Sequence, residues 1–379
     1  MYIVKKVRRV ITALLILMLL IILLIYSEEC SEGIIKGLKN CYELLIPSLF
    51  PYMLLSGLIM YTGTDRYIGK IFSPVVKILF NLPGESAAAV ILSLVGGYPI
   101  GAKCIDQLYK EKKIDLSQAQ RMSMFCVCPG PAFMITAIGT LMLKNSGAGI
   151  ILYFSQIISA IIIGLAVGII SRKESLRKKI IKGETGDKTG PMSFVTALIK
   201  ACTDASAAVI SMTSLVAIFS MLINVMELSN VTKAVQTVFT AVGAGKRETA
   251  VFIPVLTEVT AGCTAIKNEG LPLWWFSAAA GFGGLCVHFQ IFAILRETPV
   301  PRKKYILFRV LNAVLSGIVC YIICKLFPME EDVFSMYGGR SAEISSSTSV
   351  GSIALIIMCA VFLMSVRFFA FQSSRKRKK

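Results

Sequence analysis

Leu92-Ser-Leu-Val-Gly-Gly-Tyr-Pro-Ile-Gly-Ala-Lys103 is an apolar segment that glycine and proline interrupt near its middle. A second segment of the same kind, Phe125-Cys-Val-Cys-Pro-Gly-Pro-Ala-Phe133, follows it. A bilayer holds no water to pair with free backbone N–H and C=O groups, so a broken helix is stable there only inside protein or beside a wet cavity. Transporters build solute sites from such helices. In a membrane protein, these two segments therefore indicate a solute site.

The composition places the chain in a membrane. Hydrophobic residues make up 55% and charged residues 16% of the 379 residues, and the mean hydropathy is +0.72, unlike a soluble globular protein. Residues 10–26 form an uncharged run that can cross a hydrocarbon core of roughly 30 Å. A cleaved signal peptide is the alternative, but the run is longer than a usual signal core and no clear small-residue cleavage site follows, which favours a retained signal anchor.

Further apolar runs predict an all-α polytopic membrane protein. The predicted spans are 10–26, 38–61, 118–143, 148–170, 194–226, 272–295, 305–327 and 353–371. The shorter apolar pieces 87–105 and 250–266 are each broken near the middle, which predicts two re-entrant hairpins that enter and leave by the same face. Amphipathic stretches at 67–82 and 231–242 precede the hairpins and are expected to lie along an interface.

The order of these elements predicts a repeat. Gly262 and Ile266 follow Gly101 and Ile105 at one common separation. A shared order of elements favours a true repeat over chance matching of apolar residues. The expected domains are an N-terminal signal-anchor span at 1–37, a first repeat at 38–171, a basic cytoplasmic linker at 172–191, a second, inverted repeat at 192–327, and an outer loop, final span and basic tail at 328–379.

The net charge of +18, from 40 Lys and Arg against 22 Asp and Glu, is concentrated beside the apolar spans. The basic segments lie at the N-terminus and at 172–188, 296–304 and 375–379. Positive flanks stay in the cytoplasm, so both termini are expected there, and we expect contact with anionic lipid rather than with nucleic acid. The two repeats then enter the bilayer from opposite faces, which is the inverted topology that exposes a central site to each side in turn.

The sequence gives little support to metal or enzyme chemistry. Most of the eleven cysteines lie in apolar runs and are interpreted as small hydrophobic residues. Cys126 and Cys128 lack the two-residue spacer of a zinc or redox pair, and the chain has one histidine, so neither a metal nor a cofactor is expected. Neither a nucleophile elbow nor a phosphate loop occurs, so the chain is not predicted to be an enzyme.

The breaks themselves supply the predicted solute site. A helix that restarts inside the membrane points unpaired N–H groups and a positive dipole end at the break, where anions bind. Glycine allows a ligand to approach the backbone, although glycine and proline also serve tight packing or kinks. The predicted substrate-binding residues are Gly96, Gly97, Tyr98, Pro99, Gly101, Lys103, Cys128, Pro129, Gly130, Pro131 and Gly262.

Ionisable side chains in these segments are costly in hydrocarbon unless they face a cavity or a partner. Lys103 either neutralises a substrate carboxylate or extends toward the cytoplasmic face. Glu258 is the first candidate for coupling transport to a cation or proton, with an ion pair to Lys267 as the alternative. His288 ranks below it as a coupling candidate, because histidine in such places is more often a packing residue. Asp204 is either a coupling candidate or a polar contact between helices.

The segment from Pro83-Gly-Glu-Ser86 through Gly96-Gly-Tyr-Pro99 to Phe125-Cys-Val-Cys-Pro-Gly-Pro131 resembles the nucleoside-recognition, or Gate, domain of the YlbJ/SpoVV family of sporulation integral membrane proteins of endospore-forming Firmicutes. Gate domains are in turn similar to the hairpin regions of concentrative nucleoside transporters. The resemblance implies a transporter that moves dipicolinic acid across the outer forespore membrane, from mother cell toward forespore. The second copy keeps Gly262 but has no Gly-Gly-Tyr-Pro.

Other functions are compatible with the same residues. A nucleoside or another small organic anion would also fit a site of this kind. A membrane scaffold that assembles other sporulation proteins is the non-transport alternative, since a scaffold needs no polar path through the membrane. The coupling ion and the oligomeric state are not predicted.

Overall fold

The computed structural model describes residues 2–175 and 192–327, and every regular element in these residues is helical. The elements of the N-terminal part are α1 (Tyr2–Ile25), α2 (Ser27–Asn40), the π-helix η1 (Cys41–Leu45), α3 (Ile46–Tyr61), α4 (Asp65–Phe80), the 3₁₀ turn η2 (Gly84–Ser86), α5 (Ala87–Gly96), α6 (Tyr98–Lys110), α7 (Leu116–Phe125), the π-helix η3 (Ala132–Met142) and α8 (Ser146–Ser175). The remaining elements are α9 (Phe194–Leu228), α10 (Val231–Ala241), α11 (Lys246–Thr257), α12 (Val259–Asn268), α13 (Leu273–Phe282), α14 (Gly284–Ile294) and α15 (Arg302–Leu326).

This arrangement is that of an all-α polytopic membrane protein. In the described residues, five helices are long and apolar enough to cross a bilayer, or up to six if one bent pair forms a span. The five are Ser27–Tyr61, Ser146–Arg172, Phe194–Leu228, Leu273–Ile294 and Arg302–Leu326. The first of them includes α2 and α3, so the predicted start of the first repeat, at residue 38, falls inside a helix. The predicted span 353–371 and most of the linker 172–191 lie outside the described residues.

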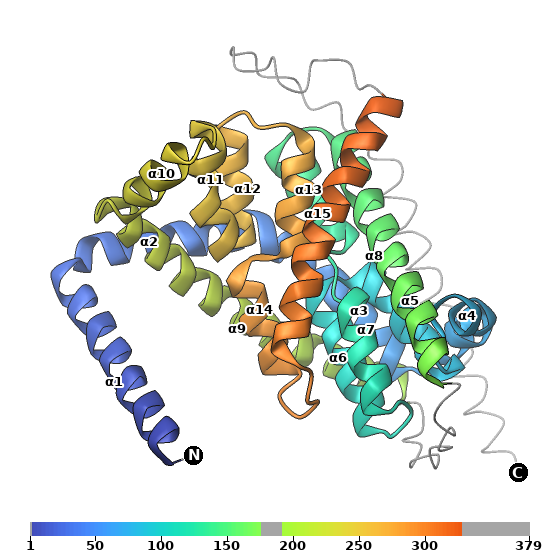
Figure 1. Cartoon of the computed structure of the whole chain (residues 1–379). Helices are drawn as coiled ribbons and strands as arrows, with labels where there is room; N and C mark the ends of the chain where they lie inside the picture. The colour runs from blue at the N-terminus through green and yellow to red at the C-terminus, as the bar shows by residue number, and fades with distance from the viewer. Residues whose placement is uncertain (1, 176–191, 328–379) are drawn as a thin grey trace, which may run out of the picture. The chain divides into compact units, whose positions relative to one another are not determined.

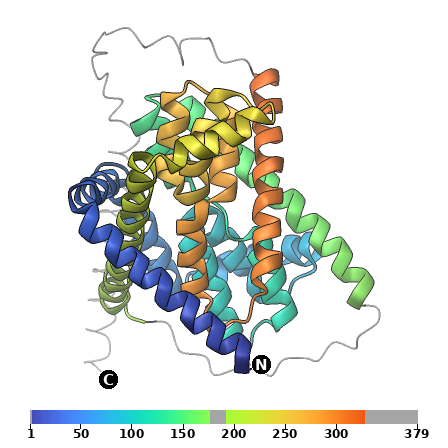
Figure 2. The same cartoon turned by 60° about the vertical axis from the view of Figure 1, so that its left-hand side comes forward.

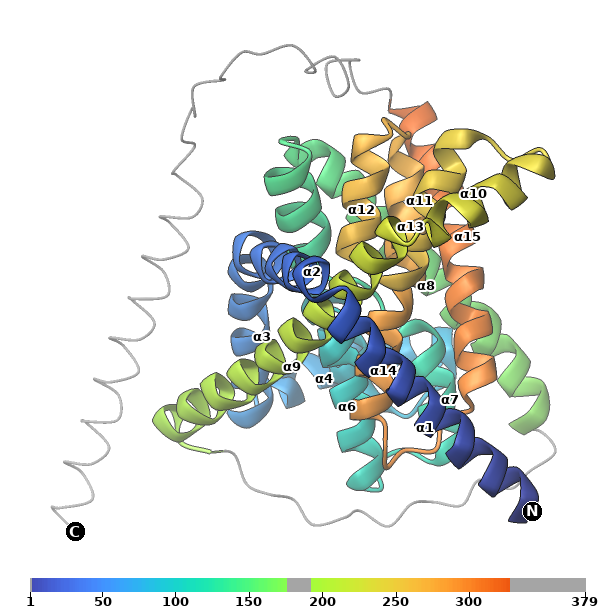
Figure 3. The ribbon, with the colours of Figure 1, turned by 90° about the vertical axis from the view of Figure 1, so that its left-hand side faces the viewer.

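The same order of elements occurs twice. A long helix, an amphipathic helix, a helical hairpin, a broken helix and a second long helix make up α3 to α8, and the same series makes up α9 to α15. The paired helices α5 and α6 pack against each other, as do α11 and α12, so both predicted breaks at 87–105 and 250–266 form hairpins. In Figures 1 and 3, α6 and α7 lie near one end of the bundle and α10, α11 and α12 near the other.

Long helices hold the hairpins from two sides. On one side, α9 packs against α2 and α3, and Gly33 of α2 lies so close to α9 that a Cβ there would be 2.6 Å from Met221 Cα. On the other side, α15 packs against α8 and α13 and runs along the bundle between its two ends (Figure 2). Small residues permit this close approach between membrane helices.

Buried polar side chains join α8, α13 and α15. Ser155 Oγ lies 2.7 Å from Ser277 Oγ, and Gln156 Nε2 donates a hydrogen bond of 2.8 Å to the Ser277 carbonyl oxygen. Ser159 Oγ donates to Asn312 Oδ1 at 2.7 Å. Because lipid offers no alternative partners, such hydrogen bonds hold membrane helices together and fix their register.

The hairpin geometry and the positive flanks together predict the topology. We expect a cysteine at Lys113, in the turn between α6 and α7, to react with an impermeant maleimide from the cytoplasm. A cysteine at Asn268, at the end of α12, should react from the opposite face. Labelling of Lys113→Cys and Asn268→Cys in intact cells, in a cysteine-free background, measures this. Reaction of both from one face would contradict the inverted topology.

Candidate functional site

The first hairpin turns at Gly97. This residue has φ +82° and ψ −172°, a backbone conformation that residues other than glycine rarely adopt. Pro99 stands in the first turn of α6, where its missing N–H is not needed for an intrahelical bond. The Gly-Gly-Tyr-Pro string thus ends one helix and starts the next at a defined angle.

The second break lies against the first. Residues 126–130 leave the helical path between α7 and η3, and Gly130 packs on the hairpin turn. A Cβ at Gly130 would lie 2.8 Å from the Val95 carbonyl oxygen and 2.9 Å from the Gly97 nitrogen. Both positions therefore require glycine, one for its φ angle and the contact, the other for the contact alone.

The second copy has the same arrangement with different residues. Glu258, in extended conformation, separates α11 from α12, and its carboxylate accepts hydrogen bonds from Thr260 N at 2.8 Å and Ala261 N at 2.7 Å. Gly283 separates α13 from α14, and both it and Gly284, the first residue of α14, have positive φ. A Cβ at Gly284 would lie 3.2 Å from the Glu258 backbone. Each hairpin turn therefore sits against a break of a neighbouring span, and a protein carboxylate caps the start of α12.

A small pocket lies between these breaks, with an accessible volume of about 40 Å³. Its wall includes both hairpin turns and both broken spans, through Gly97, Tyr98, Pro99, Gly130, Phe133, Glu258, Val259, Thr260, Cys286, Val287 and Gln290 together with Leu45, Leu49, Met212 and Val216. On this measure one water needs about 10–15 Å³, so the central pocket has room for a few waters and is far below the roughly 300–1,000 Å³ of drug-sized ligand sites. The hairpins must move apart before a ligand fills it.

A larger chamber lies beside the central pocket, with a volume of about 250 Å³. Its wall consists of Met53, Ser56, Gly57, Met60, Tyr61, Pro99, Ile100, Lys103, Ala201, Asp204, Ala205, Ala208 and Ile294. Pro99 lines both spaces, which places the chamber next to the turn of the first hairpin.

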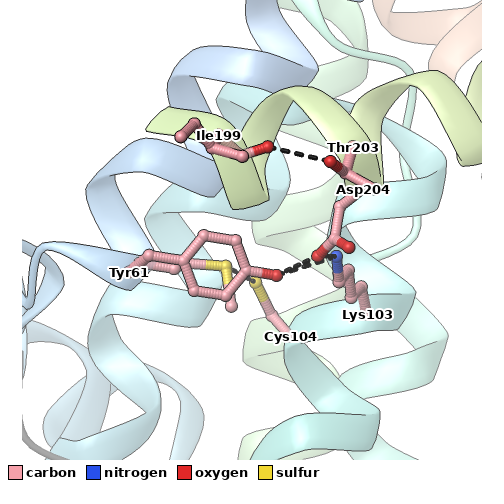
Figure 4. Close-up of polar contacts among 7 residues, drawn as sticks. Tyr61, Lys103, Cys104, Ile199, Thr203 and Asp204 are labelled. Atoms are coloured by element: carbon pink, nitrogen blue, oxygen red, sulfur yellow. Dashed lines mark hydrogen bonds and ion pairs between the residues drawn. The ribbon is translucent and has the colours of Figure 1, made fainter. Parts of the chain in front are cut away.

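An ion pair forms part of the chamber wall. Lys103 Nζ lies 2.8 Å from Asp204 Oδ2, and the Tyr61 hydroxyl donates a hydrogen bond to the same oxygen. Figure 4 shows the three side chains converging from α6, α9 and the end of α3. Lys103 Nζ is also 3.3 Å from the Tyr61 hydroxyl. The side chains of Lys103 and Asp204 are 45% and 33% exposed, so this pair is only partly removed from solvent.

A second cation, Arg309 of α15, is 1% exposed. Its guanidinium donates hydrogen bonds to the carbonyl oxygens of Val127 and Gly281, and Nε reaches the Phe282 carbonyl at 3.4 Å. These carbonyls stand where α7 and α13 end, and a positive charge is favourable at a helix C-terminus. The guanidinium also lies 5.7 Å from the centre of the Tyr98 ring. Arg309 thus joins the two broken spans to each other and contacts the first hairpin.

The predicted site residues fall into three groups. Gly97, Tyr98, Pro99, Gly130 and Glu258 line the central pocket, while Lys103 and Asp204 line the chamber with Pro99. The remaining predicted residues, none of which lines either space, are Gly96, Gly101, Cys128, Pro129, Pro131, Gly262 and His288.

Several residues of the last group have packing roles. A Cβ at Gly101 would collide with the Cys126 carbonyl oxygen, and one at Gly262 would lie 2.7 Å from Val255 Cα. His288 is wedged edge-on between Phe282 and Tyr305, with ring centroids 4.9 and 5.5 Å away.

The alternative partner of Glu258 is not found in contact with it. Lys267 Nζ instead donates a hydrogen bond of 2.8 Å to the Met142 carbonyl, at the end of η3. Glu258 pairs with backbone N–H groups, as a helix cap does.

Sequence reasoning missed Arg309, Tyr61 and Gln290. Arg309 lies inside the predicted span 305–327, two turns into α15, where a charged residue is itself a signal for a buried partner or a cavity. Gln290 interrupts an apolar span, which is a usable signal, because a polar residue inside a membrane helix normally faces protein or a cavity. Tyr61 gives no such signal.

Comparisons with known proteins agree with this architecture. The Gate family, described as nucleoside recognition, matches residues 43–172, which include η1 to α8 except for their outermost residues. The chain is therefore a multi-pass membrane protein with a Gate domain. It is 26% identical over 316 residues to the sporulation integral membrane protein YlbJ of Bacillus subtilis (strain 168), a match that covers 76% of each chain. The chain is thus similar to YlbJ over most of its length and has a Gate domain in its N-terminal half. No solved structure gives a significant match.

The role of Arg309 predicts a large loss of stability in Arg309→Met. The substitution leaves buried carbonyl oxygens at the ends of α7 and α13 without their donor, at a cost of about 1–3 kcal/mol for each unsatisfied group. Thermal unfolding of the purified protein in detergent measures the change. Lys304→Met, at an exposed position on the same helix, is the matched control and should unfold like wild type. Equal unfolding temperatures for the two variants would show that Arg309 does not hold the breaks together.

Proposed function

We propose that this protein transports a small organic anion, dipicolinic acid, across the outer forespore membrane from the mother cell toward the forespore. The observation that carries the proposal is the convergence of both hairpin turns and both broken spans on one pocket in the middle of the helical bundle. Irregular backbone inside a membrane protein is stable where it lines a cavity, and transporters place substrate at such points. The similarity to YlbJ supports a role in sporulation.

The start of α6 and the ammonium group of Lys103 beside it favour an anion, while the carboxylate of Glu258 is already held by backbone N–H groups. The first N–H groups of a helix have no intrahelical partner, and at α12 the Glu258 carboxylate takes two of them. Among residues 2–175 and 192–327, no side chain caps the start of α6 at Tyr98. Lys103 lies one turn further along the same helix from Pro99. A helix start and a nearby ammonium group together suit a planar compound with two carboxylates.

Glu258 is proposed to couple transport to a cation or proton. It is 1% exposed, lines the central pocket and carries the charge at the turn of the second hairpin. A proton or cation on the carboxylate would weaken its hold on the start of α12 and so favour a rearrangement of the hairpin. Both termini are proposed to lie in the cytoplasm of the mother cell, as the basic flanks suggest.

Two other functions compete with this proposal. A nucleoside transporter would use the same pocket for a neutral ligand, which the Gate description favours. A scaffold would leave the breaks as packing devices. Uptake by vesicles that contain only this protein distinguishes all three, because a scaffold moves no solute.

Purified protein in vesicles should take up labelled dipicolinate, and Gly97→Ala and Gly130→Ala should each abolish uptake. Alanine at position 97 is strained by the positive φ, and alanine at position 130 presses on the backbone of the first hairpin turn. Each change therefore disturbs the close contact between the hairpin turn and the broken span. Gly69→Ala is the control, since a Cβ there would meet Ala88 Cβ at an ordinary 3.6 Å. Normal uptake by both pocket variants would show that the helix breaks serve packing and do not form the substrate site.

Cells that lack the protein should still synthesise dipicolinate but form spores deficient in it. External dipicolinate should not readily correct the defect, because a dianion crosses bilayers poorly. A broad failure of spore assembly would favour the scaffold instead.

In sporulating cells, Glu258→Gln should reproduce the low-dipicolinate spore at normal protein level, because the amide keeps the shape but removes the charge. Glu248→Gln, at an exposed position on α11, is the matched control and should leave the dipicolinate content normal. Spores with normal content in the Glu258 variant would remove the coupling role and leave transport standing.

A further inference from the structure

The chamber between α3, α6 and α9 has the properties of a carboxylate site that is distinct from the central pocket. Its wall is largely apolar, and its charged groups are Lys103 and Asp204, with the Tyr61 hydroxyl beside them. At about 250 Å³ it is slightly below the usual range for drug-sized ligands, about 300–1,000 Å³. An apolar wall with one cation and a hydroxyl fits a small aromatic carboxylate, with the ring on the apolar side chains and the carboxylate on Lys103.

The ligand of Lys103 in the described conformation is a protein carboxylate. Lys103 and Tyr61 both reach Oδ2 of Asp204. A substrate carboxylate offers the same chemical group, so it can take over both contacts. The exchange replaces one carboxylate by another at Lys103 and Tyr61, so the charge-assisted hydrogen bonds of both groups are kept.

The contrast with Arg309 identifies Lys103 as the exchangeable cation. Arg309 is fully enclosed, and its donors are engaged by backbone carbonyls at the ends of two helices. Lys103 is about half exposed, and its partner is a side-chain carboxylate rather than a backbone carbonyl. A carboxylate in the chamber therefore meets one cation that can change partners.

The pair also ties the first hairpin to α9. Lys103 belongs to α6, Asp204 to α9 and Tyr61 to α3, while Pro99, one turn before Lys103, borders the central pocket. The base of α6 has separate ties, from Asp106 to Thr298 at 2.8 Å and from Lys110 to Glu297 at 3.0 Å. Loss of the Lys103–Asp204 contact would thus release the part of the hairpin next to its turn while the base stays anchored.

We propose that the chamber binds the carboxylate of the transported compound by exchange, with the substrate displacing Asp204 from Lys103 and Tyr61 and thereby freeing the first hairpin from α9. This proposal rests on the proposed function for the identity of the substrate. The chemical class it requires is a small aromatic carboxylate. A neutral nucleoside cannot replace Asp204, because it brings no negative charge to Lys103.

The exchange predicts effects of opposite sign for the two partners. Asp204→Asn removes the competing charge, so dipicolinate should bind about fivefold more tightly to the purified full-length protein. Lys103→Gln removes the cation, so the same ligand should bind about tenfold or more weakly. Equilibrium dialysis with labelled dipicolinate measures both constants. If the pair were only a structural tie, the two substitutions would weaken binding alike, and that result would overturn the proposal.

A labelling experiment locates the bound ligand. It depends neither on a transport assay nor on the Lys103→Gln variant. Ala208, half-buried in the chamber wall, is replaced by cysteine in a cysteine-free background, and its rate of reaction with a small thiol reagent is measured. Dipicolinate and picolinate should slow the reaction, whereas the corresponding amides should not. Equal protection by acids and amides, or none by either, would contradict the carboxylate site.

The outcomes separate this proposal from the proposed function. Protection of the cysteine at position 208 by picolinate, together with absence of dipicolinate uptake in vesicles, would support the chamber and reject dipicolinate as the transported compound. In the opposite case, vesicles take up dipicolinate, the cysteine at position 208 is not protected, and Asp204→Asn and Lys103→Gln weaken binding alike. That result would leave the transport proposal standing and reject the chamber as the binding site.

Discussion

The guanidinium of Arg309 satisfies backbone carbonyls that the breaks in α7 and α13 would otherwise leave unpaired inside the membrane. Hydrocarbon offers no water for this purpose, so a broken span is stable only where protein groups complete its hydrogen bonds. Because one side chain serves both breaks, the two interruptions lie side by side. The hairpin turns can then meet them, which creates the central pocket.

The charged side chains near the breaks are of two kinds: those fixed by backbone hydrogen bonds and those that can change their partner. Arg309 and Glu258 are buried and hydrogen-bonded to backbone groups at a helix end and a helix start, respectively. Lys103 and Asp204 pair with each other at the wall of the open chamber. This division matches the needs of a transporter, in which a stable frame has to surround groups that can release one partner and take another. The two units are alike in their order of elements but differ in charge, because a protein carboxylate occupies the helix start in the second unit alone.

The sequence predicted the elements better than the contacts between them. Glycine and proline marked the first hairpin turn and both broken spans, because few other residues permit these backbone conformations. The second hairpin was expected from Gly262, but it turns at Glu258, which is in extended conformation. The pairing of Lys103 with Asp204 was not predictable, since the residues lie 101 positions apart and periodicity carries no information on which helix faces meet. Arg309 was missed, although a charged residue inside a predicted span is itself a signal. Glu258 was found, but its role as a cap depends on the start of α12 and not on Lys267.

Direct binding tests the central claim that the breaks and the chamber recognise a dicarboxylate. Labelled dipicolinate is titrated against the purified protein, and pyridine-2,6-dicarboxamide, which has nearly the same shape without the charge, is added as competitor. We expect saturable binding that excess unlabelled dipicolinate displaces and the diamide does not. Absence of binding, or equal displacement by the neutral diamide, would contradict the account.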